Sequence, residues 1–373
     1  MKPRYYFLDN IRWVTVCLVL IYHVFYNFNS LGVFGAVCAG HFGPNQWQDI
    51  VCTALNPWFM TLMFVLAGAS SRYALTRRNA TEFRKERVRK LLVPSTVGLF
   101  VFGWVLGIVN ISSGDGWALM PEGMPLWVKY LIACGSGTGH LWFLQDLLGF
   151  SLLLLALRKL IDAEKVNEWL GRLSDKALTL VMVALLPLLW VVSQTQIDNP
   201  SAAQGLLNLY RPAFYLVGFV VGYYIFSSER VHNLLAKRAV VLMCVALVSA
   251  VAFCWQFYGA DYTSPVALQS PLCNLFCWAM VLAMMGAFKR WADTTTPFAS
   301  YMTKSSFGIY VVHMAVCSWA CFGLKGCTLP EWSIYALALV ATFAGSVVLW
   351  EALRRIPFVR WAVFGISKPK KKE

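Results

Sequence analysis

Long apolar runs, separated by short polar or basic segments, dominate the chain from residue 12 to residue 353. Most of these runs hold roughly 18–22 residues, and a helix needs about 20 to cross a membrane. The period-two alternation of an outer-membrane β-barrel is absent from the sequence. We therefore predict an all-α integral membrane protein, a bundle of about ten transmembrane helices at residues 12–30, 51–71, 91–111, 141–158, 177–193, 209–226, 239–258, 269–288, 305–323 and 332–353.

Composition supports a single membrane domain over residues 1–373, with a basic tail at 359–373. The chain is 58% hydrophobic and only 13% charged, whereas about a quarter of a soluble protein's residues are charged. The longest segment between predicted spans, 112–140, is rich in glycine and proline. It ends in a short apolar piece, LWVKYLIAC, which we expect to lie along the membrane interface.

Basic residues lie almost entirely on one side of the ten predicted spans. With both termini on the same side, 29 Lys and Arg residues lie on the terminus side and three on the other. This asymmetry predicts that both termini are cytoplasmic. We attribute the net charge of +14 to topology and to contact with anionic membrane lipid, and we predict no nucleic-acid partner. The 11 cysteines show no zinc-like spacing, so no metal site is predicted.

The first predicted span contains two polar residues that share a helix face. Arg12 and His23 are eleven residues apart, which is three turns plus about 20°, and about 16 Å along the axis. Arg12 then lies at the cytoplasmic boundary and His23 near the middle of the membrane. An ionisable group at that depth is costly and usually marks a functional interior, although it can also be a hydrogen-bonded packing residue. A cation at the cytoplasmic boundary and a base deeper in the membrane would suit the binding of a coenzyme A thioester.

Further along the chain, several polar residues lie in or beside apolar runs. Arg84, Arg87 and Lys90 lie near the inner end of the third span, three residues apart. They are expected to share one side of a helix, as a phosphate clamp or simply as cytoplasmic charge. At the predicted outer side the fourth span begins with His140, Trp142 and Asp146, a group suited to a hydroxylated ligand. Trp142 would equally suit the interfacial aromatic belt.

Five stretches resemble membrane acyltransferase family 3. LDNIRWVTVCLVLIYH resembles the family's first-helix signature, an Arg or Lys, ten residues, then His. FVLAGASSRYAL resembles the end of its second span, with Ala67 where the family commonly has Ser. FRKERVRKLLVP resembles its third-span motif, with Arg87 and Lys90, or alternatively Arg84 and Arg87, as the basic pair. GHLWFLQDLLGF and SSFGIYVVHM resemble two further motifs, and they supply His140, Trp142, Tyr310 and His313.

The resemblance implies a multi-pass enzyme of the bacterial inner membrane that moves an acyl group, acetyl or succinyl, from cytoplasmic acyl-coenzyme A to a hydroxyl of a glycan or other hydroxylated acceptor. It looks most similar to the subgroup that succinylates periplasmic glucans. His23 is then the expected general base, and Arg12, Arg87, Lys90 and Arg84 the candidates for donor binding. The expected acceptor pocket is formed by His140, Trp142, Asp146, His313 and Tyr310.

A second interpretation comes from another class of protein. A secondary transporter or flippase would use His23 and His313 as a proton relay, and an intramembrane Asp would serve it too. Transporters often contain inverted repeats with broken helices in corresponding positions, and no such repeat is evident in this sequence. A membrane-embedded sensor that has lost activity is a weaker third interpretation.

Overall fold

The computed structural model describes residues 5–31, 35–44, 46–195 and 211–367, and these residues are helical or irregular, without strands. Nine helical segments among them are long and apolar enough to cross a membrane. These segments are Tyr6–Asn27, Trp47–Leu75, Ala80–Ser113, Gly139–Leu157, Asp175–Ser193, Ala239–Phe257, Pro271–Trp291, Pro297–Leu324 and Glu331–Leu353. The prediction of an all-helical membrane protein is confirmed.

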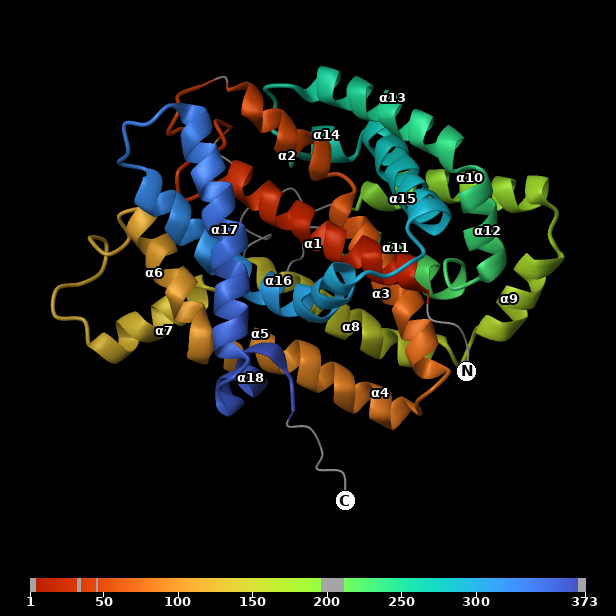
Figure 1. The fold of residues 1–373 in the computed structure, drawn as a ribbon, viewed down its shortest axis with the longest axis horizontal. Coiled ribbons are helices and arrows are strands. Elements are labelled where there is room, and N and C mark those ends of the chain that lie inside the picture. The colour runs from red at the N-terminus through yellow and green to blue at the C-terminus, as the bar shows by residue number, and fades with distance from the viewer. Residues whose placement is uncertain (1–4, 32–34, 45, 196–210, 368–373) are drawn as a thin grey trace.

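The individual helices are shown in Figure 1. They include α1 (Tyr6–Asn27), α3 (Phe59–Leu75), α6 (Trp104–Ser113), α8 (Trp142–Leu157), α10 (Asp175–Ser193), α11 (Pro212–Tyr224), α13 (Ala239–Phe257), α15 (Pro271–Trp291), α16 (Pro297–Leu324) and α17 (Glu331–Leu353). The remaining ones are α2 (Ile50–Leu55), α4 (Ala80–Arg87), α5 (Val93–Ser95), α7 (Leu126–Ser136), α9 (Ala163–Arg172), α12 (Glu229–Lys237), α14 (Pro265–Leu268) and α18 (Pro357–Phe364).

The predicted span 209–226 differs most from the structure. Its described part is α11, which has 13 residues and is not among the nine segments long enough to cross a membrane. Its first two residues, 209 and 210, lie outside the described residues. The apolar piece LWVKYLIAC forms α7, which packs against α6.

Capping residues explain why several helices begin before their apolar runs. Asn79 and Glu82 form a capping box at the start of α4, in which each side chain accepts a hydrogen bond from the other residue's backbone. Thr296, nine residues before the predicted start of that span, caps α16 by accepting a hydrogen bond from the backbone N–H of Ala299. Hydropathy marks the part of a helix inside the membrane, whereas these polar caps mark where the helix begins.

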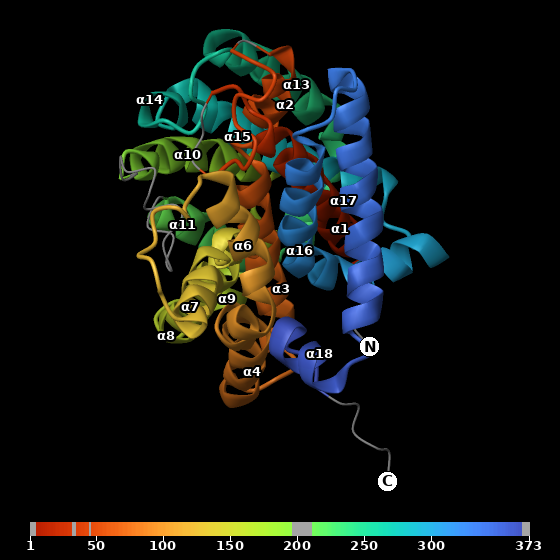
Figure 2. The same cartoon turned by 90° about the vertical axis from the view of Figure 1, so that its left-hand side faces the viewer.

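Helix α1 lies in the middle of the bundle, where Figure 1 shows it crossing the centre of the molecule. It contacts α2, α3, α15, α16 and α17, and Figure 2 shows α16 and α17 lying side by side next to it. The side of α1 that holds Arg12 and His23 therefore faces other helices of the bundle rather than the periphery. By contrast α13 presents exposed Val248 and Trp255 outward, as expected for a lipid-facing helix.

Two glycines allow α3 and α11 to pack closely. A Cβ at Gly68 would lie 2.0 Å from the carbonyl oxygen of Phe219, and one at Gly222 would lie 2.2 Å from that of Val65. Membrane helices commonly use small residues to bring their backbones together, because lipid provides no hydrophobic driving force for their association. This packing holds in place the end of α3, which carries part of the candidate site.

Candidate active site

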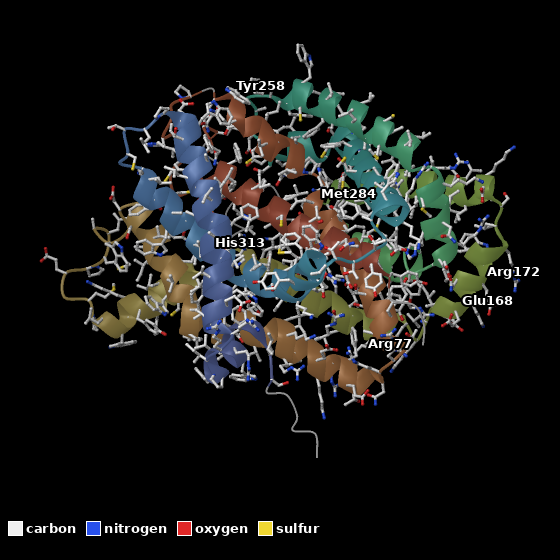
Figure 3. The ribbon with its side chains drawn as sticks, viewed as in Figure 1. Arg77, Glu168, Arg172, Tyr258, Met284 and His313 are labelled. Carbon is white, nitrogen blue, oxygen red and sulfur yellow. The ribbon has the colours of Figure 1, made fainter. Side chains whose placement is uncertain are left out.

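Three histidines from distant parts of the chain meet inside the bundle. His23 comes from α1, His140 from the 3₁₀ turn Gly139–Leu141, and His313 from α16. The His23 Nδ1 and His313 Nε2 atoms are 3.2 Å apart, and the His140 and His313 ring centroids are 4.9 Å apart. His313 is fully buried, as its interior position in Figure 3 illustrates, whereas His23 is partly exposed. Of the three, His23 is the one most accessible to a ligand.

Backbone carbonyls determine which nitrogen of each imidazole carries the proton. His23 Nδ1 lies 2.8 Å from the Val19 carbonyl oxygen, and His313 Nδ1 lies 2.5 Å from that of Tyr310. A carbonyl only accepts, so each Nδ1 is assigned as a donor and each Nε2 keeps a lone pair. The Nδ1–H of His23 therefore donates to Val19 and also points at the lone pair of His313 Nε2. The basic atom of His23 is its Nε2.

His140 has the opposite tautomer. Its Nε2 lies 2.9 Å from the Val311 carbonyl oxygen and therefore carries the proton, and its buried Nδ1 has no hydrogen-bond partner among the described residues. The Tyr310 hydroxyl donates to the His140 carbonyl oxygen over 2.5 Å, which ties α16 to the turn that holds His140. The role of Tyr310 is therefore to position His140 rather than to offer a free hydroxyl to a ligand.

Arg12 and Arg87 are brought together by two adjacent serines of α3. The Arg12 Nη2 donates to Ser70 Oγ over 2.8 Å, and the Arg87 Nη2 donates to Ser71 Oγ over 3.0 Å. Arg12 also forms an ion pair of 3.0 Å with Asp9. Two guanidinium groups, one from α1 and one from α4, are thus held on neighbouring residues at the end of α3. Like charges repel, so this arrangement is suited to a ligand with several negative charges.

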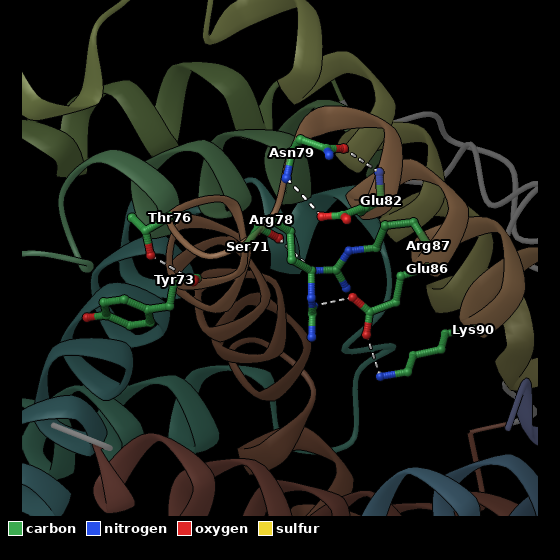
Figure 4. A network of polar contacts seen from close by, with 9 residues as sticks. All are labelled: Ser71, Tyr73, Thr76, Arg78, Asn79, Glu82, Glu86, Arg87 and Lys90. Atoms are coloured by element: carbon green, nitrogen blue, oxygen red, sulfur yellow. Dashed lines mark hydrogen bonds and ion pairs between the residues drawn. The ribbon is translucent and has the colours of Figure 1, made fainter. Parts of the chain in front are cut away.

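The other two candidate cations, Lys90 and Arg84, point elsewhere, as Figure 4 shows for Lys90. Lys90 pairs with Glu86 over 2.7 Å, and Glu86 also contacts Arg78. Arg84 is exposed. The prediction that these residues share one side assumed a regular α-helix, but residues 88–92 form a π-helical turn. Of the three cations, Arg87 donates a hydrogen bond to α3, while Lys90 pairs with Glu86.

The residues of the predicted outer side lie at the start of α8. Trp142 is stacked on Tyr215 of α11, with ring centroids 5.5 Å apart and planes inclined by 28°. Asp146 is only 9% exposed, and its Oδ2 has no hydrogen-bond partner among the described residues. Gln145 Oε1 is buried and unpartnered in the same way. One face of Trp142 is therefore covered by protein, while the two polar side chains beside it remain available to a ligand.

Sequence reasoning missed Ser70, Ser71 and Tyr215. The adjacent serines lie in the motif FVLAGASSRYAL, but nothing in that stretch indicates that they contact two arginines from other helices. Nothing in the sequence distinguishes Tyr215 from the other aromatic residues of the apolar helices. No group of three or more His, Cys, Asp or Glu in the part of the chain that the structure describes is arranged to hold a metal ion.

Comparison with known proteins identifies the family of this chain. The family model described as "Acyltransferase domain" matches residues 5–351. Glucans biosynthesis protein C from Escherichia coli strain SMS-3-5 is 21% identical over 374 residues, which covers 97% of this chain and 94% of that protein. The protein of the same name from E. coli strain SE11 gives the same identity and coverage. No solved structure gives a significant match. The chain therefore belongs to acyltransferase family 3 and is a membrane acyltransferase.

Proposed function

We propose that this protein transfers an acyl group, acetyl or succinyl, from cytoplasmic acyl-coenzyme A to a hydroxyl of a glycan or other hydroxylated acceptor. The observation that carries the proposal is the relative position of three groups. Arg12 and Arg87 meet at Ser70 and Ser71, and His23 lies on the same face of α1 as Arg12. Eleven residues of helix separate Arg12 from His23 by about 16 Å, a distance suited to the pantetheine arm of coenzyme A.

In this proposal the two arginines hold the phosphates of the donor. Guanidinium groups bind phosphate oxygens through two parallel hydrogen bonds, and their charge does not depend on pH in the physiological range. The serine hydroxyls fix one nitrogen of each guanidinium and leave other N–H groups for the ligand. The Nε of Arg87 is buried and has no partner among the described residues, so this guanidinium has unused hydrogen-bonding capacity.

His23 acts as the general base. Its Nε2 accepts the proton of the acceptor hydroxyl while the hydroxyl oxygen attacks the thioester carbonyl carbon. The carbon–oxygen bond forms, the carbon–sulfur bond breaks, and the departing thiolate takes the proton back from the imidazolium. The Val19 carbonyl and His313 Nε2 both face the Nδ1–H of His23, and both stabilise the imidazolium that forms. His313 is thus a positioning residue in this mechanism.

The same hydrogen bonds argue against the proton-relay interpretation. A relay would pass the proton from His23 to His313 and then onward. The Nδ1–H of His313 donates to the Tyr310 carbonyl, and a peptide carbonyl does not release a proton to a further carrier. A proton relay would therefore end at His313. In acyl transfer His23 returns its proton to the leaving thiolate, so no further proton carrier is needed.

Binding of acyl-coenzyme A to the purified full-length protein in detergent tests this proposal. We expect the Kd to rise by about tenfold or more in Arg12→Ala and in Arg87→Ala, because each removes a charged hydrogen bond worth roughly 1.5–3 kcal/mol. The matched control is Arg84→Ala, since Arg84 is an exposed cation on the same helix as Arg87. Equal weakening in all three variants, or no binding of acetyl- or succinyl-coenzyme A to the wild type, would contradict the proposal.

A further inference from the structure

Arg211 is a buried cation outside the group formed by the three histidines, Arg12 and Arg87. It directly precedes α11, and only 3% of its surface is exposed. Its Nε is buried and has no hydrogen-bond partner among the described residues. Its described contacts are mainly aromatic, since the guanidinium carbon lies 4.1 Å from the Phe214 ring centroid and 5.9 Å from that of Tyr215.

The contacts of Arg211 with the described residues, which include a hydrogen bond with the Tyr215 side chain, offset the cost of burying this charge only in part. A buried guanidinium loses its hydration, and a cation–π contact offsets only part of that cost. The position makes the charge less favourable still, because the N-terminus of α11 has a partial positive charge of its own. A negatively charged group at this place would satisfy both the guanidinium and the helix end.

The surroundings of Arg211 already contain groups that suit a hydroxylated ligand. Arg211 and Asp146 both interact electrostatically with the Tyr215 side chain, and Tyr215 is the ring on which Trp142 stacks. The unpartnered Oδ2 of Asp146 and Oε1 of Gln145 are hydrogen-bond acceptors, and Arg211 offers only donors. A ligand with both a hydroxyl group and an oxyanion would match this set.

Contacts between aromatic rings connect the surroundings of Arg211 with the three histidines. Tyr215 contacts Trp142, Trp142 contacts Phe143, and Phe143 lies 5.8 Å from Tyr310, measured between ring centroids. Tyr310 in turn contacts His140 and His313. Directly packed side chains therefore link Arg211 to the histidines.

We propose that Arg211 is the centre of an oxyanion subsite that binds a carboxylate group of a substrate. The proposal rests on the acyltransferase function proposed above and adds a specificity residue to it. The oxyanion belongs either to the acyl group, as the free carboxylate of a succinyl group, or to the acceptor. Both sources present the same chemistry to the guanidinium, so the experiment separates them.

The experiment compares kcat/KM for wild type, Arg211→Met and Arg211→Lys in detergent-purified full-length protein. Acetyl- and succinyl-coenzyme A are each tested with a neutral gluco-oligosaccharide and with the same oligosaccharide carrying a terminal glucuronate. We expect Arg211→Met to lower kcat/KM by roughly ten- to a hundredfold for pairs that include the relevant anion. The pair of acetyl-coenzyme A and neutral acceptor should stay within about twofold, and Arg211→Lys should recover part of the loss.

Each outcome decides the question. A loss confined to succinyl-coenzyme A assigns the oxyanion to the acyl group, and a loss confined to the glucuronate acceptor assigns it to the acceptor. An equal loss for all four pairs indicates a structural role and overturns the proposal, as does no loss at all. Lys325→Gln is the matched control, because Lys325 is an exposed cation on the same predicted side.

A second measurement keeps the test independent of turnover. If wild type transfers no acyl group with any pair, the proposed acyltransferase reaction is wrong for these substrates, and the subsite is then tested by binding alone. We expect glucuronate or succinate to raise the thermal unfolding midpoint of wild type and of Lys325→Gln but not that of Arg211→Met. The same response in all three proteins overturns the subsite.

Discussion

Replacing His313 by leucine should slow acyl transfer without weakening donor binding. His313 is fully buried and lies on α16, and its Nε2 is 3.2 Å from Nδ1 of His23. Leucine is similar in bulk to histidine and removes the acceptor nitrogen without leaving a large cavity. The Val19 carbonyl, at 2.8 Å, remains as the other acceptor for the Nδ1–H of His23.

The size of the effect follows from the charge on His23. Before the reaction His23 is a neutral donor, and a neutral hydrogen bond contributes roughly 0.5–1.5 kcal/mol. In the transition state His23 is becoming an imidazolium, and hydrogen bonds to charged groups contribute about 1.5–3 kcal/mol. The difference of about 1 kcal/mol lowers kcat about five- to tenfold. Because the Val19 carbonyl still accepts a hydrogen bond from the His23 Nδ1–H in this variant, we expect the loss of kcat to lie at the lower end of this range.

The assay is release of free coenzyme A thiol in the presence of a gluco-oligosaccharide acceptor. We expect kcat to fall and the KM for the donor to stay within about twofold, because His313 does not contact Arg12 or Arg87. The control is His313→Gln, whose amide oxygen can accept the same hydrogen bond. It should recover most of the lost activity.

Two results would refute this reasoning. Unchanged kcat in His313→Leu would show that the contact with His23 has no role in transfer. An equal loss of kcat in the leucine and glutamine variants, together with a lower thermal midpoint in both, would show that His313 contributes to packing only.

The remaining predictions concern the donor site, helix packing and acid stability. Ser70→Ala and Ser71→Ala should each raise the KM for the donor about three- to tenfold with kcat nearly unchanged, because a guanidinium loses its anchor. Gly68→Ala should destabilise the protein by roughly 1–3 kcal/mol, because the added Cβ would collide with backbone atoms of α11. Gly149→Ala is the control and should not destabilise it, because a Cβ added there has no atom within 4 Å. Thermal unfolding in detergent compares the two variants. Burial lowers the pKa of His232, which lies between spans on α12, from 6.5 to about 4. As the pH falls, the unfolded chain therefore binds a proton at His232 before the folded protein does. The free energy of unfolding falls by about 3 kcal/mol as the pH drops from about 6.5 to 4. His232→Gln, whose side chain does not titrate, should flatten that part of a plot of thermal midpoint against pH.

The relation between Arg12 and His23 was predictable because it depends only on helix geometry. Both residues lie on α1, so their spacing of eleven residues fixes their relative direction and separation. The all-helical architecture was predictable for a similar reason, since a membrane requires long apolar helices. These features depend on residues near one another in the sequence.

Contacts between helices could not be predicted in the same way. His23 and His313 are 290 residues apart, and the two serines that anchor Arg12 and Arg87 belong to a third helix. Which side chains meet depends on how the helices pack, and for α3 and α11 that packing depends on Gly68 and Gly222. The spacing of Arg87 and Lys90 predicts one shared helix side, whereas in the structure Lys90 pairs with Glu86 and residues 88–92 form a π-helical turn.

The central claim is that His23 is the general base of acyl transfer, and one comparison tests it most directly. The rate of a single turnover and the Kd for acyl-coenzyme A are measured on the same preparation of wild type and of His23→Ala. We predict that the Kd stays within about twofold while the rate of transfer falls by about a hundredfold or more, since general base catalysis contributes roughly 10²–10⁴. A His23→Ala protein that binds the donor and transfers the acyl group at close to the wild-type rate would contradict the claim.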